Sequence, residues 1–513
     1  MDRNLESAGG EVTPAARLLE SPRALLGIAF AIFLIGALRD IAAPWEDGLR
    51  GVNAAVYEEC FVRTILDWPS SVSHFAPGWV MVTDQGPVCQ WHWHHPALYP
   101  LTLSLFAWIF GQQPLTLRLV TLLLVLPALF ALHRLLSRAV SPVFAAWAVL
   151  LFACNAMIGY FLPMVVHDGA TMTFGLLACT AFWRFAEEPR PRHLAICAAL
   201  FFVATQFDFL GHLWGVSMFL LALASAHRKQ ALVGIAALFC VSLVSMWLVA
   251  LHYSFLFGGP LEFLAALSDL SKGAESQRVT AEQFGYATRH FLVDYGAWSI
   301  YALAGVGGVA LLASASPQRR RIAWLALALV TPGALGSLVS LRHYVDHAFW
   351  TMPMTAGIAT LAAGAPWAAI RLLQDGGARR RIAAAALLLC SLAAVAHGAV
   401  SVHQLIAKFQ PRDGSFAASI AEAEPYARGV SVVLTDAEVE MRAYLPGVLT
   451  LGSVSTVAQL DQWIEFARAR AMLVEVAFLL SRDAADAALR QRLEQLAKPN
   501  ELRRWSVYRF QVR

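Results

Sequence analysis

Long apolar segments recur along the chain from residue 24 to residue 402. A helix needs about 20 apolar residues to cross the roughly 30 Å hydrocarbon core of a membrane, and most of these runs approach or exceed that length. Only 14% of the 513 residues are charged, against about 25% in a soluble protein. The sequence therefore predicts a mainly α fold, a polytopic transmembrane bundle of about 11 helices. The predicted crossings are residues 24–43, 115–136, 143–166, 169–185, 194–210, 211–226, 231–257, 298–313, 322–341, 348–373 and 382–402.

The polar segment 1–23 precedes the first crossing and is predicted to be a cytoplasmic tail. No small-residue cleavage site follows the first apolar run, so we expect a retained transmembrane helix rather than a signal peptide.

Basic residues alternate from loop to loop, as expected when cytoplasmic loops collect Lys and Arg. This pattern predicts a multi-pass protein of the cell inner (plasma) membrane with a cytoplasmic N-terminus. The net charge of +4 is too small to suggest a nucleic-acid partner. The basic loops contain Arg134, Arg138, Arg184, Arg190, Arg192, Arg228, Lys229, Arg319, Arg320, Arg321, Arg371, Arg379, Arg380 and Arg381.

The first outer loop, residues 44–114, is long for a connection, and such loops tend to be functional or disordered. Its aromatic and apolar content argues against disorder. Within it, residues 95–111 are apolar but interrupted by Pro96 and Pro100, and follow two tryptophans. This stretch is predicted to be a helix in the outer interface, not a crossing.

Residues 405–513 have the composition of a soluble domain, following a transmembrane domain at 24–404. The segments GVSVVLTD, GVLTLGSV and RRWSVYRF are predicted strands, and AQLDQWIEFARA and DAADAALRQRLEQLA are predicted amphipathic helices. We expect a small α/β domain on the outer (periplasmic) face, to which no chemistry is assigned.

Asp168 is the clearest candidate for chemistry, since an ionisable group near a membrane segment tends to mark a site. It lies between two apolar runs, directly after His167. The alternative is that its carboxylate caps the helix that follows, and the two roles can coexist. In the first outer loop, Glu46, Asp47, Glu58 and Glu59 are candidates for a general base, although a loop carboxylate is often only solvated.

Two clusters rich in histidine lie on the predicted outer face. The WHWHHP segment contains His94 and His95, but its irregular spacing favours contact with the membrane surface or an anionic headgroup, and no metal site is expected. The RHYVDHAFW segment concentrates cationic side chains that suit a phosphate, or alternatively anchor the chain at the interface. These side chains are Arg342, His343 and His347.

Four segments resemble the GT-C-fold glycosyltransferases, the superfamily of protein O-mannosyltransferases and lipid A aminoarabinose transferases. They are HHPALYPLTLSLFAWIFGQQPLTLRL, YFLPMVVHDGATMTFGLLAC, RHYVDHAFWTMPM and, more weakly, FDFLGHLWG. The resemblance covers roughly residues 24–402. It implies transfer of a sugar, hexosyl or pentosyl, from a polyprenyl-phosphate donor to a glycan, lipid or protein acceptor on the outer face, usually with inversion.

The resemblance also implies that the first outer loop supplies the catalytic base. The VNAAVY run is similar to one that follows the acid in related proteins, which favours Asp47, with Glu46 beside it, over Glu58. Asp168 is the second acid, and no cofactor is needed because protein cations can neutralise a departing monophosphate. The implied substrate-binding residues are His94, His95, His167, Asp208, His212, Arg342, His343 and His347.

The main alternative is a polytopic transporter or flippase of a lipid-linked or small anionic substrate. Such proteins commonly contain repeated halves and polar residues near the bilayer midplane. No clear internal repeat is found here, and the charged residues cluster at one surface, so the transferase is favoured.

Overall fold

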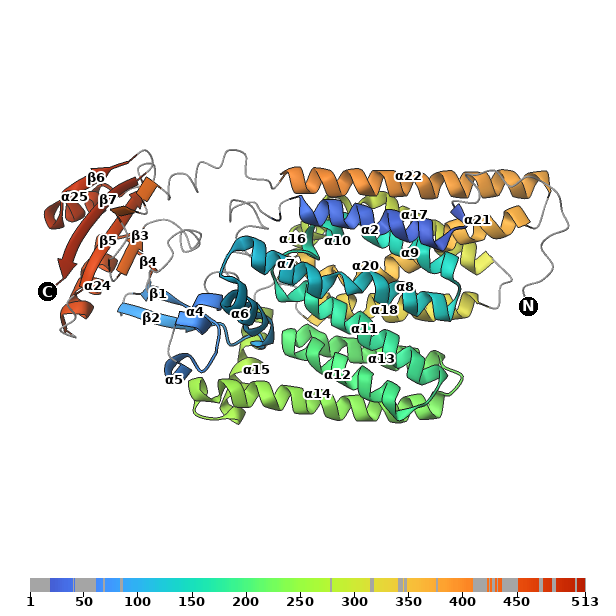
Figure 1. Cartoon of the computed structure of the whole chain (residues 1–513), viewed down its shortest axis with the longest axis horizontal. Helices are drawn as coiled ribbons and strands as arrows, with labels where there is room; N and C mark the ends of the chain where they lie inside the picture. The colour runs from blue at the N-terminus through green and yellow to red at the C-terminus, as the bar shows by residue number, and fades with distance from the viewer. Residues whose placement is uncertain are drawn as a thin grey trace.

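The computed structural model is a bundle of long helices with a separate α/β unit at one end (Figure 1). The structure describes residues 19–39, 41, 61–67, 70–83, 86–276, 279–313, 318–339, 345, 348–374, 377–408, 422–423, 425–426, 430, 432–435, 451–469, 474–481, 486–502 and 505–512.

Helix starts in the bundle are defined by proline and by short polar caps. Pro142 occupies the first turn of α9, where its missing N–H costs nothing, and the Ser141 side chain accepts a hydrogen bond from the Phe144 N–H. The bundle contains α2 (Pro22–Leu38), α7 (Pro114–Val125), α8 (Pro127–Ala139), α9 (Pro142–Ala153), α10 (Ala156–Phe161), α11 (His167–Glu187), α12 (Pro191–Phe207), η2 (Phe209–Leu213), α13 (Trp214–Ala224), α14 (Arg228–Phe257), α15 (Pro260–Ser276), α16 (Ala281–Arg289), η3 (His290–Asp294), α17 (Trp298–Ala313), α18 (Arg319–Val339), η4 (Ala348–Thr351), α20 (Met354–Ala362), α21 (Gly364–Gln374) and α22 (Ala378–Lys408).

Each of the predicted crossings contains one to three consecutive helices, so the expected count of about 11 is consistent with the structure. Within the described part of the chain, five helices are long and apolar enough to cross a membrane, or up to six if a bent pair is one span. Several other crossings are shorter apolar helices, such as α2 and α12. The crossing predicted at 194–210 ends earlier, because α12 stops at Phe207 and Asp208 has extended backbone.

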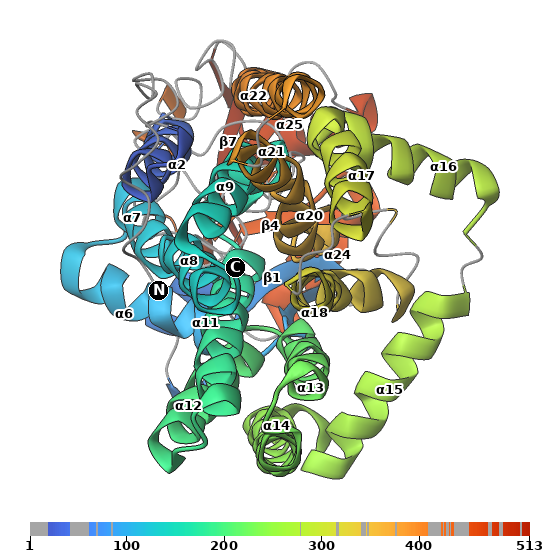
Figure 2. The same cartoon turned by 90° about the vertical axis from the view of Figure 1, so that its right-hand side faces the viewer.

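Close helix contacts in the bundle depend on small residues. This is common in membrane proteins, because the hydrophobic effect does not drive helices together in lipid and close van der Waals packing does so instead. A Cβ at Gly307 of α17 would lie 2.1 Å from the Leu361 carbonyl oxygen of α20, so only glycine allows this approach. Figure 2, which looks along the bundle, shows α17 and α20 next to each other.

The described part of the first outer loop forms α4 (Val62–Asp67), α5 (Ser70–Ser73), the antiparallel hairpin β1 (Gly78–Thr83) and β2 (Gly86–Trp91), and α6 (Leu98–Phe110). At 13 residues, α6 is about 20 Å long, which is too short to cross the hydrocarbon core. Its Trp108 and Phe110 side chains are exposed. The helix is thus present and too short for a crossing, and its position in the outer interface stays a prediction.

The C-terminal unit contains a five-stranded sheet of order β4-β3-β5-β7-β6 with two helices. Strands β3, β4 and β5 are parallel, whereas β7 pairs antiparallel with β5 and β6. The predicted helices and three predicted strands are present, and β5 and the short β6 are not predicted by the sequence. The elements are β3 (Val432–Thr435), β4 (Leu451–Ser453), α24 (Val457–Ala469), β5 (Val474–Ser481), α25 (Ala487–Leu496), β6 (Pro499–Glu501) and β7 (Trp505–Val512).

Strand β5 is the centre of this unit and is apolar on both faces. Phe478 packs with the helices, whereas Ala477 and Leu479 pack in a second cluster on the other face. The unit also touches the first outer loop, because β4 and α24 contact the β1–β2 hairpin. Figure 1 shows the hairpin between the C-terminal unit and the helix bundle.

Candidate functional site

Asp168 lies in the first turn of α11, where a carboxylate complements the positive end of the helix dipole. The N-cap residue is Val166, so Asp168 is not the capping residue itself. The residue is only 8% exposed. Its Oδ2 lies 3.8 Å from Nε2 of His167, which begins the helix.

Asp208 lies in the break between α12 and η2 and is 1% exposed. Its Oδ1 accepts a hydrogen bond from the Leu210 N–H at 3.1 Å, which caps η2. Its Oδ2 lies 2.7 Å from Nε2 of His167, and its Oδ1 lies 3.4 Å from Nδ1 of His95. Asp208 therefore joins a residue of α11 to a residue of the first outer loop.

Three histidines follow strand β2 and converge before α6. The ring centroids of His92 and His94 are 4.0 Å apart, and those of His94 and His95 are 4.9 Å apart. The Tyr253 hydroxyl of α14 donates a hydrogen bond to the His95 carbonyl oxygen at 2.9 Å. The loop is thus attached to the bundle at the residue that reaches Asp208.

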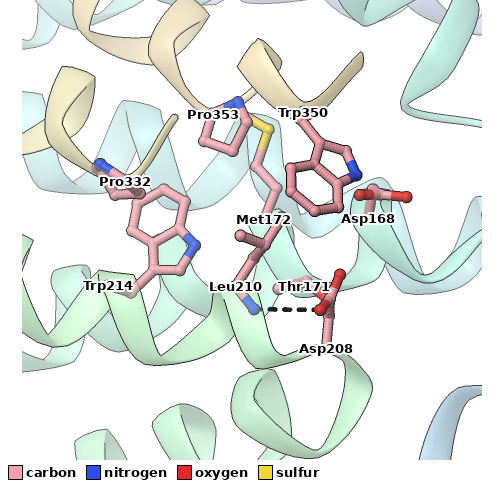
Figure 3. A pocket seen from close by; sticks show the side chains of 9 residues that line it. All are labelled: Asp168, Thr171, Met172, Asp208, Leu210, Trp214, Pro332, Trp350 and Pro353. Carbon is pink, nitrogen blue, oxygen red and sulfur yellow. Dashed lines mark hydrogen bonds between the residues drawn. The ribbon is translucent and has the colours of Figure 1, made fainter. Parts of the chain in front are cut away.

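A small, partly open cavity lies beside the two aspartates (Figure 3). Trp214 forms one wall, and its indole packs where a Cβ at Gly175 would clash at 2.4 Å. Most of the remaining lining is apolar. The lining residues are Asp168, Thr171, Met172, Asp208, Leu210, Trp214, Pro332, Trp350 and Pro353.

The surroundings of Asp208 and His92 shift the pKa values of both side chains and so set their charges at neutral pH. Burial alone would raise the pKa of the Asp208 carboxyl, but His167 and His95 hold that pKa well below its usual range. Burial lowers the pKa of His92 well below 6.5, and the neighbouring His95 and His94 lower it further. At neutral pH, Asp208 is therefore an anion and His92 a neutral imidazole.

The structure brings together five of the residues that the sequence singled out. They are His94, His95, His167, Asp168 and Asp208, which come from the first outer loop, α11 and the α12–η2 break. His212 follows in η2, and its Nδ1 lies 2.7 Å from the Ser242 hydroxyl of α14. The remaining candidates lie outside the described residues. They are Glu46, Asp47, Glu58, Glu59, Arg342, His343 and His347.

Sequence reasoning did not single out Trp214 or Trp350, which line the cavity. Tryptophans are abundant in this chain, at 16, so composition gives no signal for these two. His92 belongs to the WHWHHP segment, which is predicted to contact the membrane surface or an anionic headgroup, but it is not among the predicted substrate-binding residues.

Replacing Asp208 with asparagine is expected to destabilise the bundle by about 3–5 kcal/mol, because it leaves buried imidazoles without their charge partner. The asparagine side-chain oxygen can still cap η2, so the substitution removes the negative charge but keeps the cap. Thermal unfolding in detergent measures the effect. Glu188→Gln, which breaks an exposed pair with Arg190, is the control and should cost at most about 1 kcal/mol. Equal effects of the two substitutions would contradict a structural role for the buried pair.

Comparison with known proteins confirms the GT-C fold that the sequence resemblance predicted. Residues 94–252 match the family described as dolichyl-phosphate-mannose-protein mannosyltransferase. This segment is less than half of the chain, and it includes His94, His95, His167, Asp168 and Asp208. No curated protein matches the chain.

Two solved structures share this fold over most of the chain. ArnT from Cupriavidus metallidurans, bound to undecaprenyl phosphate, is 12% identical with a TM-score of 0.56, and the alignment covers 94% of this chain and 97% of ArnT. The oligosaccharyltransferase AglB from Archaeoglobus fulgidus, in complex with an inhibitory peptide and a dolichol-phosphate, is 13% identical with a TM-score of 0.55, and the alignment covers 89% of this chain and 69% of AglB.

Proposed function

We propose that the chain is an inverting membrane glycosyltransferase that moves a sugar from a polyprenyl-phosphate carrier to an acceptor at the outer face of the cell inner membrane. The observation that carries the proposal is the pair of buried aspartates, Asp168 and Asp208, on one cavity with imidazoles beside them. Both structural neighbours, ArnT and AglB, were solved with a lipid phosphate bound. The fold they share with this chain makes a lipid-linked donor the substrate class to test first.

The reaction requires a group that accepts the proton of the attacking hydroxyl and groups that stabilise the departing phosphate. We assign the first role to Asp47, with Glu46 and Glu58 as the alternative carboxylates. Asp168 lines the cavity and is assigned to orient the acceptor hydroxyl. Asp208 is a positioning residue, since two histidines and a backbone N–H already surround it.

The departing phosphate is an anion and needs positive partners. We assign this role to three histidines that the structure describes, His94, His95 and His167. We assign it also to Arg342, His343 and His347, which lie outside the described residues. His212 supports the same region through its contact with α14. The cavity lining includes the aromatic rings of Trp214 and Trp350, which we assign to contact the flat face of the sugar at the mouth of the cavity.

The location of the cavity favours a transferase over a transporter. Asp168 is at the start of α11 and Asp208 is just beyond the end of α12, so both are at the end of the bundle that carries the outer loop. A transporter site is expected near the bilayer midplane instead.

Native mass spectrometry of the purified protein tests the choice of donor. We expect a copurified polyprenyl-phosphate species, retained less by Arg342→Ala because a phosphate contact is lost. A loss of one charge-assisted contact corresponds to about 1.5–3 kcal/mol, or roughly 10- to 100-fold in affinity.

Arg289→Ala is the matched control, since Arg289 is a basic residue at the end of α16 that does not line the cavity. It should retain the carrier at the level of the unmodified protein. Recovery of ordinary phospholipids alone, or equal loss in both variants, would contradict the assignment.

A further inference from the structure

The three imidazoles after strand β2 are arranged as ligands of a single ion. One nitrogen from each of His92, His94 and His95 lies within 4.8 Å of the other two. In a tetrahedral zinc site with Zn–N bonds of about 2.0–2.1 Å, ligand nitrogens are about 3.3 Å apart. Small side-chain rotations therefore suffice to bring the three nitrogens to ligand distances.

The donors are held in this arrangement by their surroundings. His92 is buried, and its ring packs against the Phe61 ring with centroids 4.4 Å apart. His95 is fixed through its carbonyl oxygen by the Tyr253 hydroxyl. The three residues lie in a turn between β2 and α6. Residues in a turn can converge on one metal ion without the regular spacing that a helix would require.

Asp208 adds a feature typical of metal-binding histidines. Such a histidine usually has its second ring nitrogen held by a carboxylate or carbonyl, which fixes the orientation of the ring. Nδ1 of His95 lies 3.4 Å from Asp208 Oδ1, which directs Nε2 of His95 away from the carboxylate.

A second set of donors, His95, His167 and Asp208, also lies within 4.8 Å. In that set, Asp208 already pairs with His167 at 2.7 Å and caps η2. We therefore favour the set of three histidines, with Asp208 as the carboxylate that orients His95.

We propose that His92, His94 and His95 bind a divalent transition-metal ion, with Zn²⁺ as the probe. Imidazole ligands suit zinc, copper, nickel and iron, and three protein ligands leave a further position open to water or substrate. At this position the ion would supply positive charge that the proposed function otherwise assigns to the imidazoles. The assignment of the metal site does not depend on the transferase activity.

Metal content of the purified full-length chain tests the site. The protein is first stripped with a chelator, then incubated with Zn²⁺ and separated from free metal. It should retain about one Zn²⁺ per chain, as measured by inductively coupled plasma mass spectrometry. His92→Gln and His94→Ala should each retain at least about fivefold less, since each removes a ligand. His252→Ala, which removes an imidazole outside both donor sets, should retain as much as the unmodified chain.

Further measurements distinguish the two donor sets and exclude misfolding. His167→Gln should keep its Zn²⁺, and loss of metal in this variant together with retention in His94→Ala would assign the ion to the other donor set and overturn the proposal. Co²⁺ in place of Zn²⁺ should give the strong visible absorption of four-coordinate cobalt in the unmodified chain but not in His94→Ala. Metal-free thermal unfolding and gel filtration identify variants that are misfolded. If the folded, unmodified chain retains no more Zn²⁺ than folded His94→Ala, the proposal is wrong.

Discussion

Asp47→Asn is expected to reduce sugar transfer by about 10²- to 10⁴-fold, the usual effect of removing a general base. Asparagine has nearly the same size as aspartate but cannot accept a proton at neutral pH. Because the substitution acts on the transition state, retention of the lipid carrier should change much less than the rate. Initial rates of transfer and carrier binding, measured on the same preparation, separate the two effects.

Glu58→Gln and Glu46→Gln are the matched controls, since both remove a carboxylate from the same outer loop. We expect them to retain most of the transfer activity. Near-normal turnover by Asp47→Asn together with a large loss in Glu58→Gln would place the base in the second half of the loop.

Asp168→Asn is expected to reduce transfer by a comparable factor, about 10²- to 10⁴-fold, because its carboxylate lines the cavity and is assigned to orient the acceptor hydroxyl. The cost in stability should be small. Removing a charge from the first turn of a helix typically costs about 0.3–1 kcal/mol at an exposed position and up to about 2 kcal/mol at a partly buried one, which is less than the cost expected for Asp208→Asn. The variant should therefore fold and unfold at nearly the normal temperature while transferring sugar slowly.

This combination distinguishes a catalytic role from a purely structural one. If Asp168 only stabilises the start of α11, Asp168→Asn will lower the unfolding temperature slightly and leave the rate unchanged. Glu282→Gln provides a control, since Glu282 is an exposed carboxylate in the first turn of α16 and does not line the cavity. It should resemble Asp168→Asn in its small stability cost but not in its rate.

The membrane-spanning fold could be predicted from the sequence because its signals are local. Length and hydropathy identify a crossing within one segment, so the runs at 115–136 and 231–257 correspond to α7–α8 and α14. The short helix α6 was predictable for the same reason, from two prolines and nearby tryptophans. Strand β5 was not predicted, because a strand that is apolar on both faces lacks the alternating pattern of a half-buried strand.

The candidate site was predictable only in part. His167 and Asp168 are adjacent in sequence and next to an apolar run, which indicated a site. The contact of Asp208 with His167 and His95 joins residues that are more than 40 positions apart, and no local pattern reports such a contact. The same holds for the cavity walls formed by Trp214 and Trp350, which depend on the packing of helices distant in sequence.

The most direct test of the central claim is to follow the carrier lipid itself. The purified protein would be placed in vesicles with the polyprenyl-phosphate-sugar fraction extracted from membranes of the source cells, together with a mixture of cell-surface glycans, lipids and proteins as acceptors. Liquid chromatography with mass spectrometry would then measure the intact carrier and the free polyprenyl phosphate over time. We predict that the unmodified chain converts the sugar-loaded carrier to free polyprenyl phosphate, and that Asp47→Asn does so at least about 100-fold more slowly. If the loaded carrier crosses the vesicle bilayer but keeps its sugar, the protein moves its substrate without transferring the sugar, and the proposed function is wrong.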